Sequence, residues 1–242
     1  LNPLDRYVTI PARKWNKVLP FAELAWLLMG YNDLDVLPGN YVKNLYNFSD
    51  NGRTWRAGYG PRIRFMNGFK TDYDIGSKLD GNIVSGYIGM TDQLKYVVDV
   101  LNKDPYSRQA VIEIADPVKD NFDEDGNLKV TKDQPCTRLL NFQNRNGALD
   151  LTVYMRSNDL IWGFSAVNVF NFTFMLEIVA GMVGLPVGNY YHVANNLHVY
   201  EDKMDMVHEI ANSGTPKGGS HFYNLKGLTL KKLDSNLEKL HN

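Results

Sequence analysis

The sequence predicts a single α+β domain over residues 1–242. Helix and strand patterns alternate along the chain without a regular βαβ rhythm, and neither an internal repeat nor a low-complexity linker divides it. A hydrophobic content of 44% in 242 residues is enough for one substantial core.

Two stretches read as buried helices. Residues 18–30 (VLPFAELAWLLMG) are apolar on all sides except for Glu23, and residues 166–184 are nearly all apolar except for Asn168 and Asn171. A buried carboxylate is costly unless it is paired or used, so Glu23 is a candidate functional residue.

Surface helices and a long loop are also expected. Residues 91–105 form an amphipathic pattern with Thr91 as the expected N-cap and a stop at Asp104-Pro105. Residues 201–214 indicate a second surface helix. Residues 46–65 are rich in Gly, Asn and Arg and predict a loop.

Strand patterns occupy the centre of the chain. Residues 107–116 and 190–200 are each expected to form a strand, and residues 137–144 and 148–156 flank the turn pair Asn146-Gly147, which predicts a hairpin. Because side chains alternate along a strand, Arg156 is expected on the polar face of the second hairpin strand.

The charge balance excludes some partners. With 26 basic and 27 acidic residues the net charge is −1, so neither nucleic acid nor an anionic membrane is an expected partner. A single cysteine cannot form an internal disulfide, which favours a reducing compartment and therefore a cytoplasmic location. We expect no apolar run to reach the length of a membrane span, and we see no secretory signal. The chain begins at Leu1, so residues upstream are expected to be missing.

No metal site is predicted. Residues 121–132 have the acidic spacing of a calcium loop, but the twelfth position holds Lys132 where such a loop needs a bidentate glutamate. No Cys/His cluster has metal-ligand spacing.

Cys136 has two interpretations, an inert core thiol or a nucleophile. It follows a proline at the start of the hairpin, and Arg138 and Arg156 lie on the flanking strands. Cationic neighbours lower a thiol pKa, so we expect both arginines to favour the thiolate.

Six segments decide in favour of the nucleophile, because together they resemble the thymidylate synthase family, which includes phage deoxypyrimidylate hydroxymethylases. In the family's order they are FAELAWLLMGYND, GYGPRIR, DPYSRQ, QPCT, MRSND and NNLHVY, and the similarity extends from Phe21 to Met204. The resemblance implies a thymidylate synthase-like fold. It also implies one-carbon transfer from 5,10-methylenetetrahydrofolate, as co-substrate, to C5 of a pyrimidine nucleoside monophosphate.

The resemblance implies a role for each catalytic position. Cys136 is expected to add to C6 of the base, Glu23 to manage charge at O4 or N4, and Tyr59 to assist removal of the C5 proton. Asp159 is expected near the folate, with Trp55 as a further folate contact.

The remaining matches concern the nucleotide. Arg156 and Ser157 are expected to bind the phosphate, for which arginine forks are suited. His198 and Tyr200 are expected to bind the sugar 3′-hydroxyl. Arg108 corresponds to an arginine that the family donates from the second subunit, which implies a homodimer with shared sites. Surface salt bridging is the alternative for both arginines.

The sequence departs from the family pattern at several positions. Gln109 replaces a second arginine and Thr137 replaces a histidine. Asn168 lies one position later than the family's base-reading asparagine, so we assign that role to Asn168 through a one-residue bulge, with Asn171 as the second choice. The family's N-terminal phosphate-binding loop would precede Leu1, and its apolar C-terminal tail is not recognisable here.

Several functions stay open at this stage. An amide at position 168 can donate and accept, which favours uracil and therefore dUMP. The unusual tail and Thr137 favour hydroxymethylation slightly over methylation. The alternatives are a dCMP or CMP hydroxymethylase and, outside the enzyme class, a non-catalytic nucleotide- or RNA-binding relative.

Overall fold

A mixed sheet forms the centre of the fold. The computed structural model describes residues 2–37, 43, 45–67, 72–73, 90–214 and 221–241. Within them, the largest sheet has four strands in the order β1-β2-β3-β5. These strands are β1 (Val111–Glu113), β2 (Thr137–Arg145), β3 (Ala148–Met155) and β5 (Val187–Ala194). The first three pair antiparallel, and β5 pairs parallel to β3. The predicted α+β class is confirmed.

The β2–β3 hairpin forms where the sequence predicts it. Asn146 and Gly147 have φ angles of 55° and 85°, which are the two left-handed residues that a tight hairpin turn requires. The turn fixes the register from Arg145↔Ala148 onward. As a result, the inward-facing residues of β3 fill the core and the opposite face stays accessible.

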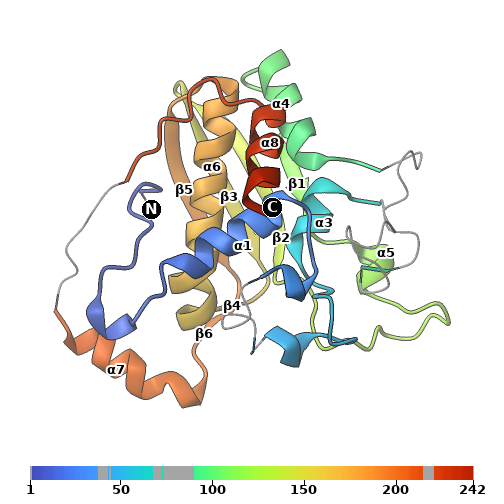
Figure 1. Ribbon diagram of the computed structural model, residues 1–242, viewed down its shortest axis with the longest axis vertical. Coiled ribbons are helices and arrows are strands. Elements are labelled where there is room, and N and C mark those ends of the chain that lie inside the picture. The colour runs from blue at the N-terminus through green and yellow to red at the C-terminus, as the bar shows by residue number, and fades with distance from the viewer. Residues whose placement is uncertain are drawn as a thin grey trace.

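Helices cover one face of this sheet. Figure 1 shows α1 (Val18–Leu28), α6 (Val169–Val183) and α8 (Leu230–His241) on the same side, and α4 (Gln93–Lys103) packs against β1 and α6. Burying apolar faces between the helix layer and the sheet supplies the main stabilisation of the fold. The C-terminal stretch, in which the family's tail is not recognisable, forms α8, and Leu233 and Leu237 of this helix lie in the core.

The longest helix has two parts. A π-helix, η4 (Leu160–Asn168), continues into α6, which ends at Gly184 in a left-handed conformation. The combined segment Leu160–Val183 has a mean hydropathy of 1.6, so by length and composition it could cross a membrane. Our expectation that no apolar run reaches this length is wrong. The helix is apolar because 67% of its most hydrophobic stretch is buried inside the protein.

Other elements differ from the sequence expectations in detail. The expected loop at 46–65 contains α3 (Tyr59–Arg64) and part of a short 3-10 helix, η3 (Leu45–Phe48). Asp92, not Thr91, caps α4, because its side chain accepts from the Lys95 N–H. The remaining short elements are η1 (Pro11–Arg13), η2 (Leu34–Val36), α5 (Pro117–Asp120), β4 (Asn158–Asp159), β6 (Leu197–His198), η5 (Glu201–Lys203) and α7 (Met204–Asn212).

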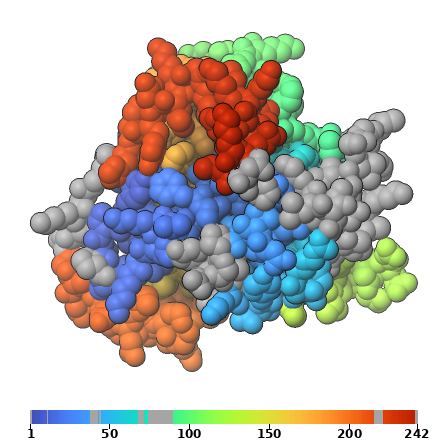
Figure 2. Space-filling model, viewed as in Figure 1, coloured from blue at the N-terminus to red at the C-terminus, as the bar shows by residue number. Residues whose placement is uncertain are grey.

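The two ends of the chain meet on one surface. Figure 2 shows the N-terminal segment between α7 and the C-terminal segment. Arg6 forms a buried ion pair with Glu177 of α6 at 2.5 Å, and the Tyr223 N–H donates to the same carboxylate at 2.5 Å. Glu177 thus anchors both terminal segments to the core helix.

Candidate active site

The loop that carries Cys136 is held by Arg156. The Arg156 guanidinium, at the end of β3, donates from Nε to the Pro135 carbonyl at 3.1 Å and from Nη2 to the Gln134 carbonyl at 2.8 Å. The Arg156 N–H also donates to the Cys136 carbonyl at 2.9 Å. Three bonds from one residue fix the backbone around the thiol, while the rest of the exposed guanidinium stays available to an anion.

Burial controls the Cys136 thiol. Arg156 and Arg138 lower its pKa, as the sequence predicts, and the Asp133 carboxylate raises it. Burial is the largest effect, however, and the net pKa of Cys136 is raised. The two arginines therefore act in the predicted direction, but burial of the side chain against the hydrophobic core outweighs them.

Glu23 lies where α1 faces the start of α6. Its Oε1 accepts a hydrogen bond from Asn171 Nδ2 at 2.9 Å. Burial raises the pKa of Glu23 to about 7, and the bond from Asn171 lowers it only partly. The carboxyl can therefore exchange a proton near neutral pH, which a structural ion pair with an arginine would prevent.

Tyr59 connects α3 to the base of the hairpin. Its hydroxyl accepts from the Thr137 N–H at 3.3 Å, and its ring stacks on Phe172 with 6.3 Å between centroids. Burial and the neighbouring Cys136 raise the pKa of Tyr59. The phenol thus stays protonated at neutral pH and sits beside the residue that follows the nucleophile.

Asn168 and Asn171 have different environments. Asn168 is the last residue of the π-helix, and its Nδ2 contacts Met155 Sδ at 3.8 Å. A π-helix bonds i to i+5 and so takes one more residue per bonded turn than an α-helix, which is the kind of bulge that the register of Asn168 requires. Asn171 is 2% exposed and already bonded to Glu23. The assignment of Asn168 as base reader stays a prediction.

A close approach shapes the helix beside Asn168. A Cβ at Gly163 would lie 2.1 Å from Asn158 Oδ1 and 3.1 Å from Asn168 Oδ1, so only glycine fits there. Asn158 is held from the other side by His192, whose Nε2 lies 2.9 Å from Asn158 Nδ2. These packing partners of the site were not found by sequence reasoning.

The residues that are expected to bind the sugar and the phosphate lie side by side. The β4–β6 pairing places Asp159 opposite His198, and Ser157 Oγ lies 3.5 Å from His198 Nδ1. The rings of His198 and Tyr200 are 5.1 Å apart, and Tyr200 is 59% exposed. Tyr200 can therefore contact a ligand, whereas Ser157 and His198 are half-buried and His198 Nδ1 also lies 3.0 Å from Asn196 Oδ1.

Asp159 and Trp55 each carry an unused polar atom. Asp159 caps η4 by accepting from the Trp162 N–H, but its buried Oδ2 has no partner among the described residues. The Trp55 ring stacks on Trp26 with 6.1 Å between centroids, and it lies close enough to Asp133 to lower that carboxyl's pKa. Trp55 Nε1 completes no hydrogen bond within the described structure.

Arg108 lies apart from these residues. Its side chain is exposed and makes no hydrogen bond or ion pair with any residue that the structure describes.

Further functional candidates were missed by the sequence reasoning. Arg13 donates to the Ile161 carbonyl at 2.6 Å, and burial lowers the pKa of its guanidinium although Asp159 opposes this. Asp133, three residues before Cys136, is a largely buried carboxyl. Its proximity to the cysteine was the available signal, whereas no local pattern pointed to Arg13.

Comparison with known proteins places this site in a family. The family model described as thymidylate synthase matches residues 7–222. The chain belongs to the thymidylate synthase family. In this chain the loop around Pro135 and Cys136 and the segment Arg156–Asp159 lie side by side, joined by the bonds from Arg156.

Phage proteins are among the relatives of this thymidylate synthase-family chain. A deoxyuridylate hydroxymethyltransferase of Bacillus phage SP01 is 40% identical over 201 residues, which are 83% of this chain and 48% of the relative. Proteins of the same name from Delftia phage PhiW-14 and Pseudomonas phage M6 are 27% and 30% identical, covering 88% and 87% of this chain and 54% and 52% of the relatives. The chain spans about half the length of these relatives.

A solved structure supports the fold. The crystal structure of thymidylate synthase from T4 phage aligns with a TM-score of 0.63 at 23% identity, over 95% of this chain and 78% of the other. At this identity the likeness shows a shared fold.

Proposed function

We propose that this chain transfers a one-carbon unit from 5,10-methylenetetrahydrofolate to C5 of dUMP through a bond between Cys136 and C6 of the base. The observation that carries the proposal is that the Arg156 guanidinium holds the Cys136 loop by hydrogen bonds to the carbonyls of Gln134 and Pro135. One guanidinium can then serve the nucleophile and a phosphate dianion together. The phosphate would add Ser157, and the sugar would add His198 and Tyr200.

The chemistry begins at the thiol. Cys136 loses its proton to solvent and forms the Sγ–C6 bond, and the π electrons of C5=C6 move toward C5 and O4. Glu23, with a pKa of about 7, donates a proton toward O4 in this step. After C5 gains its new carbon substituent, the C5 proton would pass to a solvent molecule oriented by the Tyr59 hydroxyl, which itself stays protonated. The amine that carried the carbon would then leave, and C5 would bear an exocyclic methylene. When a nucleophile adds to this methylene, the electron pair of the Sγ–C6 bond leaves with the Cys136 thiolate. Breaking the Sγ–C6 bond restores the ring double bond.

The residues present fit a folate co-substrate. The buried, unpartnered Asp159 Oδ2 is an acceptor for the N–H groups of a pterin ring, and Trp55 offers an aromatic contact. When bound, the folate supplies the one-carbon unit at the oxidation level of formaldehyde. No protein metal ligand is needed for this chemistry.

Hydroxymethylation is the favoured outcome. In that reaction water attacks the exocyclic methylene of the base, whereas in thymidylate formation the same carbon receives a hydride. The names of the three phage relatives support the first outcome. Nucleotide and folate pools are cytoplasmic, so we place the activity in the cytoplasm of the host.

A product assay tests the proposal. The chain is incubated separately with dUMP, dCMP, UMP and CMP, each with carbon-labelled methylenetetrahydrofolate, and the nucleotide product is weighed. We expect labelled hydroxymethyl-dUMP, with Cys136→Ser losing turnover while binding of dUMP changes only a few-fold. Absence of label in all four nucleotides would sink the proposal, and binding without turnover would instead favour a non-catalytic nucleotide- or RNA-binding relative.

We also propose that the active unit is a homodimer with shared sites. The sheet face opposite the helices exposes Tyr154, Tyr191 and Val193 at 38%, 45% and 43%. Three exposed side chains of this size on an otherwise polar sheet face are suited to a self-complementary interface. Arg108, which has no partner among the described residues of its own chain, would then reach the phosphate of the other subunit.

Subunit mixing tests this arrangement. Arg108→Ala and Cys136→Ala proteins are each expected to be inactive. Hybrids should regain activity, because a hybrid can have one site with both residues intact. An affinity tag on one variant reports by co-purification whether exchange has occurred, and inactive hybrids after complete exchange would contradict shared sites.

A further inference from the structure

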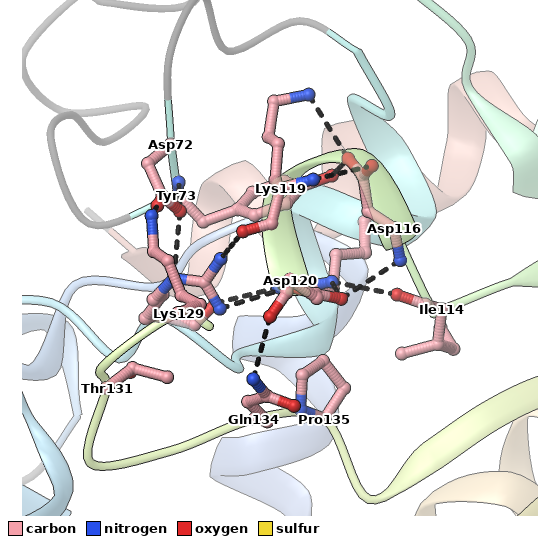
Figure 3. Close-up of polar contacts among 12 residues, drawn as sticks. Asp72, Tyr73, Ile114, Asp116, Lys119, Asp120, Lys129, Thr131, Gln134 and Pro135 are labelled. Carbon is pink, nitrogen blue, oxygen red and sulfur yellow. Dashed lines mark hydrogen bonds and ion pairs between the residues drawn. The ribbon is translucent and has the colours of Figure 1, made fainter. Parts of the chain in front are cut away.

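A buried ionic cluster lies behind the candidate site. Asp120, which is fully buried, accepts two bonds at 2.8 Å from Arg62 and one at 3.0 Å from Arg56 (Figure 3). The Asp116 N–H adds a fourth bond at 3.0 Å. These donors hold the pKa of Asp120 below its usual range although burial opposes this.

The charges of the two arginines are compensated by carboxylates inside the cluster. Arg62 and Arg56 are both 0% exposed, and Arg56 also pairs with Asp72 at 2.9 Å. The Arg62 guanidinium lies over the Tyr73 ring at 4.0 Å from its centroid. Removing one partner from such a cluster leaves an uncompensated buried charge, so its geometry is tightly determined.

One arm of the cluster leads to Tyr59. Arg62 lies three residues beyond Tyr59 in α3, and it also donates to the Ile114 carbonyl at 3.0 Å. The bidentate bond to Asp120 therefore fixes the position and rotation of the short helix that carries the Tyr59 hydroxyl.

The other arm leads to Cys136. Figure 3 shows the Gln134 side chain turned toward α5, where its Nε2 donates to the Asp120 carbonyl at 2.7 Å. The Gln134 carbonyl accepts from Arg156 on its other side. Gln134 is thus held at both ends, two residues before the nucleophile.

We propose that Asp120 and Gln134 are positioning residues that set the Tyr59 hydroxyl and the Cys136 thiol at a fixed separation. The inference rests on the proposed function for these two groups. Neither residue touches the reacting atoms, and each acts through another: Asp120 through Arg62, and Gln134 through the loop backbone. Displacements of about 1 Å at reacting groups can cost on the order of a hundredfold in rate.

Gln134→Met is the central test variant, because it removes one hydrogen bond at nearly constant volume and leaves the ionic cluster intact. We expect kcat for dUMP to fall tenfold or more while KM stays within threefold. The buried pair Arg6–Glu177 supplies the matched control, since Glu177→Gln also breaks a buried ion pair but lies among the terminal segments. Asp120→Asn breaks the ionic cluster itself. Its kcat is compared with that of Glu177→Gln under conditions in which the same fraction of each variant is folded.

The outcomes separate positioning from stability. Glu177→Gln should lower Tm with kcat per folded molecule unchanged. If Gln134→Met keeps kcat within twofold of wild type, or if Glu177→Gln loses as much kcat as Asp120→Asn, the positioning role is wrong.

Thiol alkylation keeps the inference independent of the proposed function. The rate of Cys136 alkylation by iodoacetamide at pH 8 needs no turnover. Burial raises the pKa of Cys136 and so keeps the thiolate scarce. A loop that is less firmly held should expose the thiol more often, so Cys136 should be alkylated several-fold faster in Gln134→Met than in wild type or Glu177→Gln. Wild type without turnover would remove the proposed function, whereas an alkylation rate within twofold of wild type would overturn the positioning of the loop.

Discussion

The carboxamide nitrogen of Asn171 donates a hydrogen bond of 2.9 Å to Oε1 of Glu23. The bond joins α1 to the first turn of α6, two elements that are 148 residues apart in sequence. It gives the buried carboxyl one neutral donor and no cation, so Glu23 keeps a pKa of about 7. The bond opposes the effect of burial on the Glu23 carboxyl and occupies the amide nitrogen of Asn171.

Replacing Glu23 should stabilise the protein at alkaline pH. Its pKa rises from 4.5 to about 7 on folding, so the folded state binds the proton more tightly and the stability contribution is lost as pH rises through that interval. At about 1.4 kcal/mol per pH unit, Glu23→Gln should gain up to about 3 kcal/mol above pH 7 and little below pH 4.5. Urea unfolding at pH 5 and pH 8 measures this. An equal gain at both pH values would show that ionisation is not the cause.

Removing the Asn171 donor should shift the pKa of Glu23 upward. The bond from Asn171 lowers that pKa, so Asn171→Leu leaves burial unopposed. We expect the limb of the kcat/KM profile that belongs to Glu23 to move to higher pH, and the limb to vanish in Glu23→Gln. A limb that stays in place in Asn171→Leu would mean that another group titrates there.

Local signals predicted much of the fold. The β2–β3 hairpin follows from alternation and from Asn146-Gly147, which are properties of adjacent residues. The helix α3 was missed because Gly60 and Pro61 are poor helix formers. Its position is set by Arg62 and Asp120, which are 58 residues apart, and no local pattern reports such a contact.

The site was predictable as a set of residue types but not as an electrostatic environment. The motifs brought Cys136, Arg156 and Ser157 together in the sequence, and β3 with its following loop keeps them close. The direction of the Cys136 pKa was missed, because burial by distant segments outweighs the two arginines on the hairpin. Asp133 was missed because its effect on the Cys136 pKa depends on the folded environment of its carboxyl, which no local sequence pattern reports.

Neutralising Asp133 should make the Cys136 thiol more reactive. The Asp133 carboxylate raises the pKa of Cys136, and burial raises the pKa of Asp133 itself to about 6. Asp133→Asn should therefore speed alkylation roughly three- to tenfold at pH 7 to 8, with the difference fading below pH 6, where Asp133 is protonated. Arg138→Gln should change the rate in the opposite direction, because Arg138 lowers the pKa of Cys136 and its side chain does not hold the loop. An Asp133→Asn rate equal to wild type at pH 8 would exclude this coupling.

Base preference should depend on Asn168. Its amide can accept from N3–H and donate to O4 of uracil, whereas cytosine presents an acceptor at N3 and a donor at the exocyclic amine. A site matched to one pattern leaves buried groups unpaired against the other, at about 1–3 kcal/mol each. We expect wild type to prefer dUMP and Asn168→Asp to shift the ratio of kcat/KM toward dCMP. Asn171→Asp is the matched control. The Asn171 side chain is hydrogen-bonded to Glu23, so this substitution should lower activity without changing that ratio. If Asn171→Asp changes the preference while Asn168→Asp does not, the register of the π-helix relative to the base is wrong.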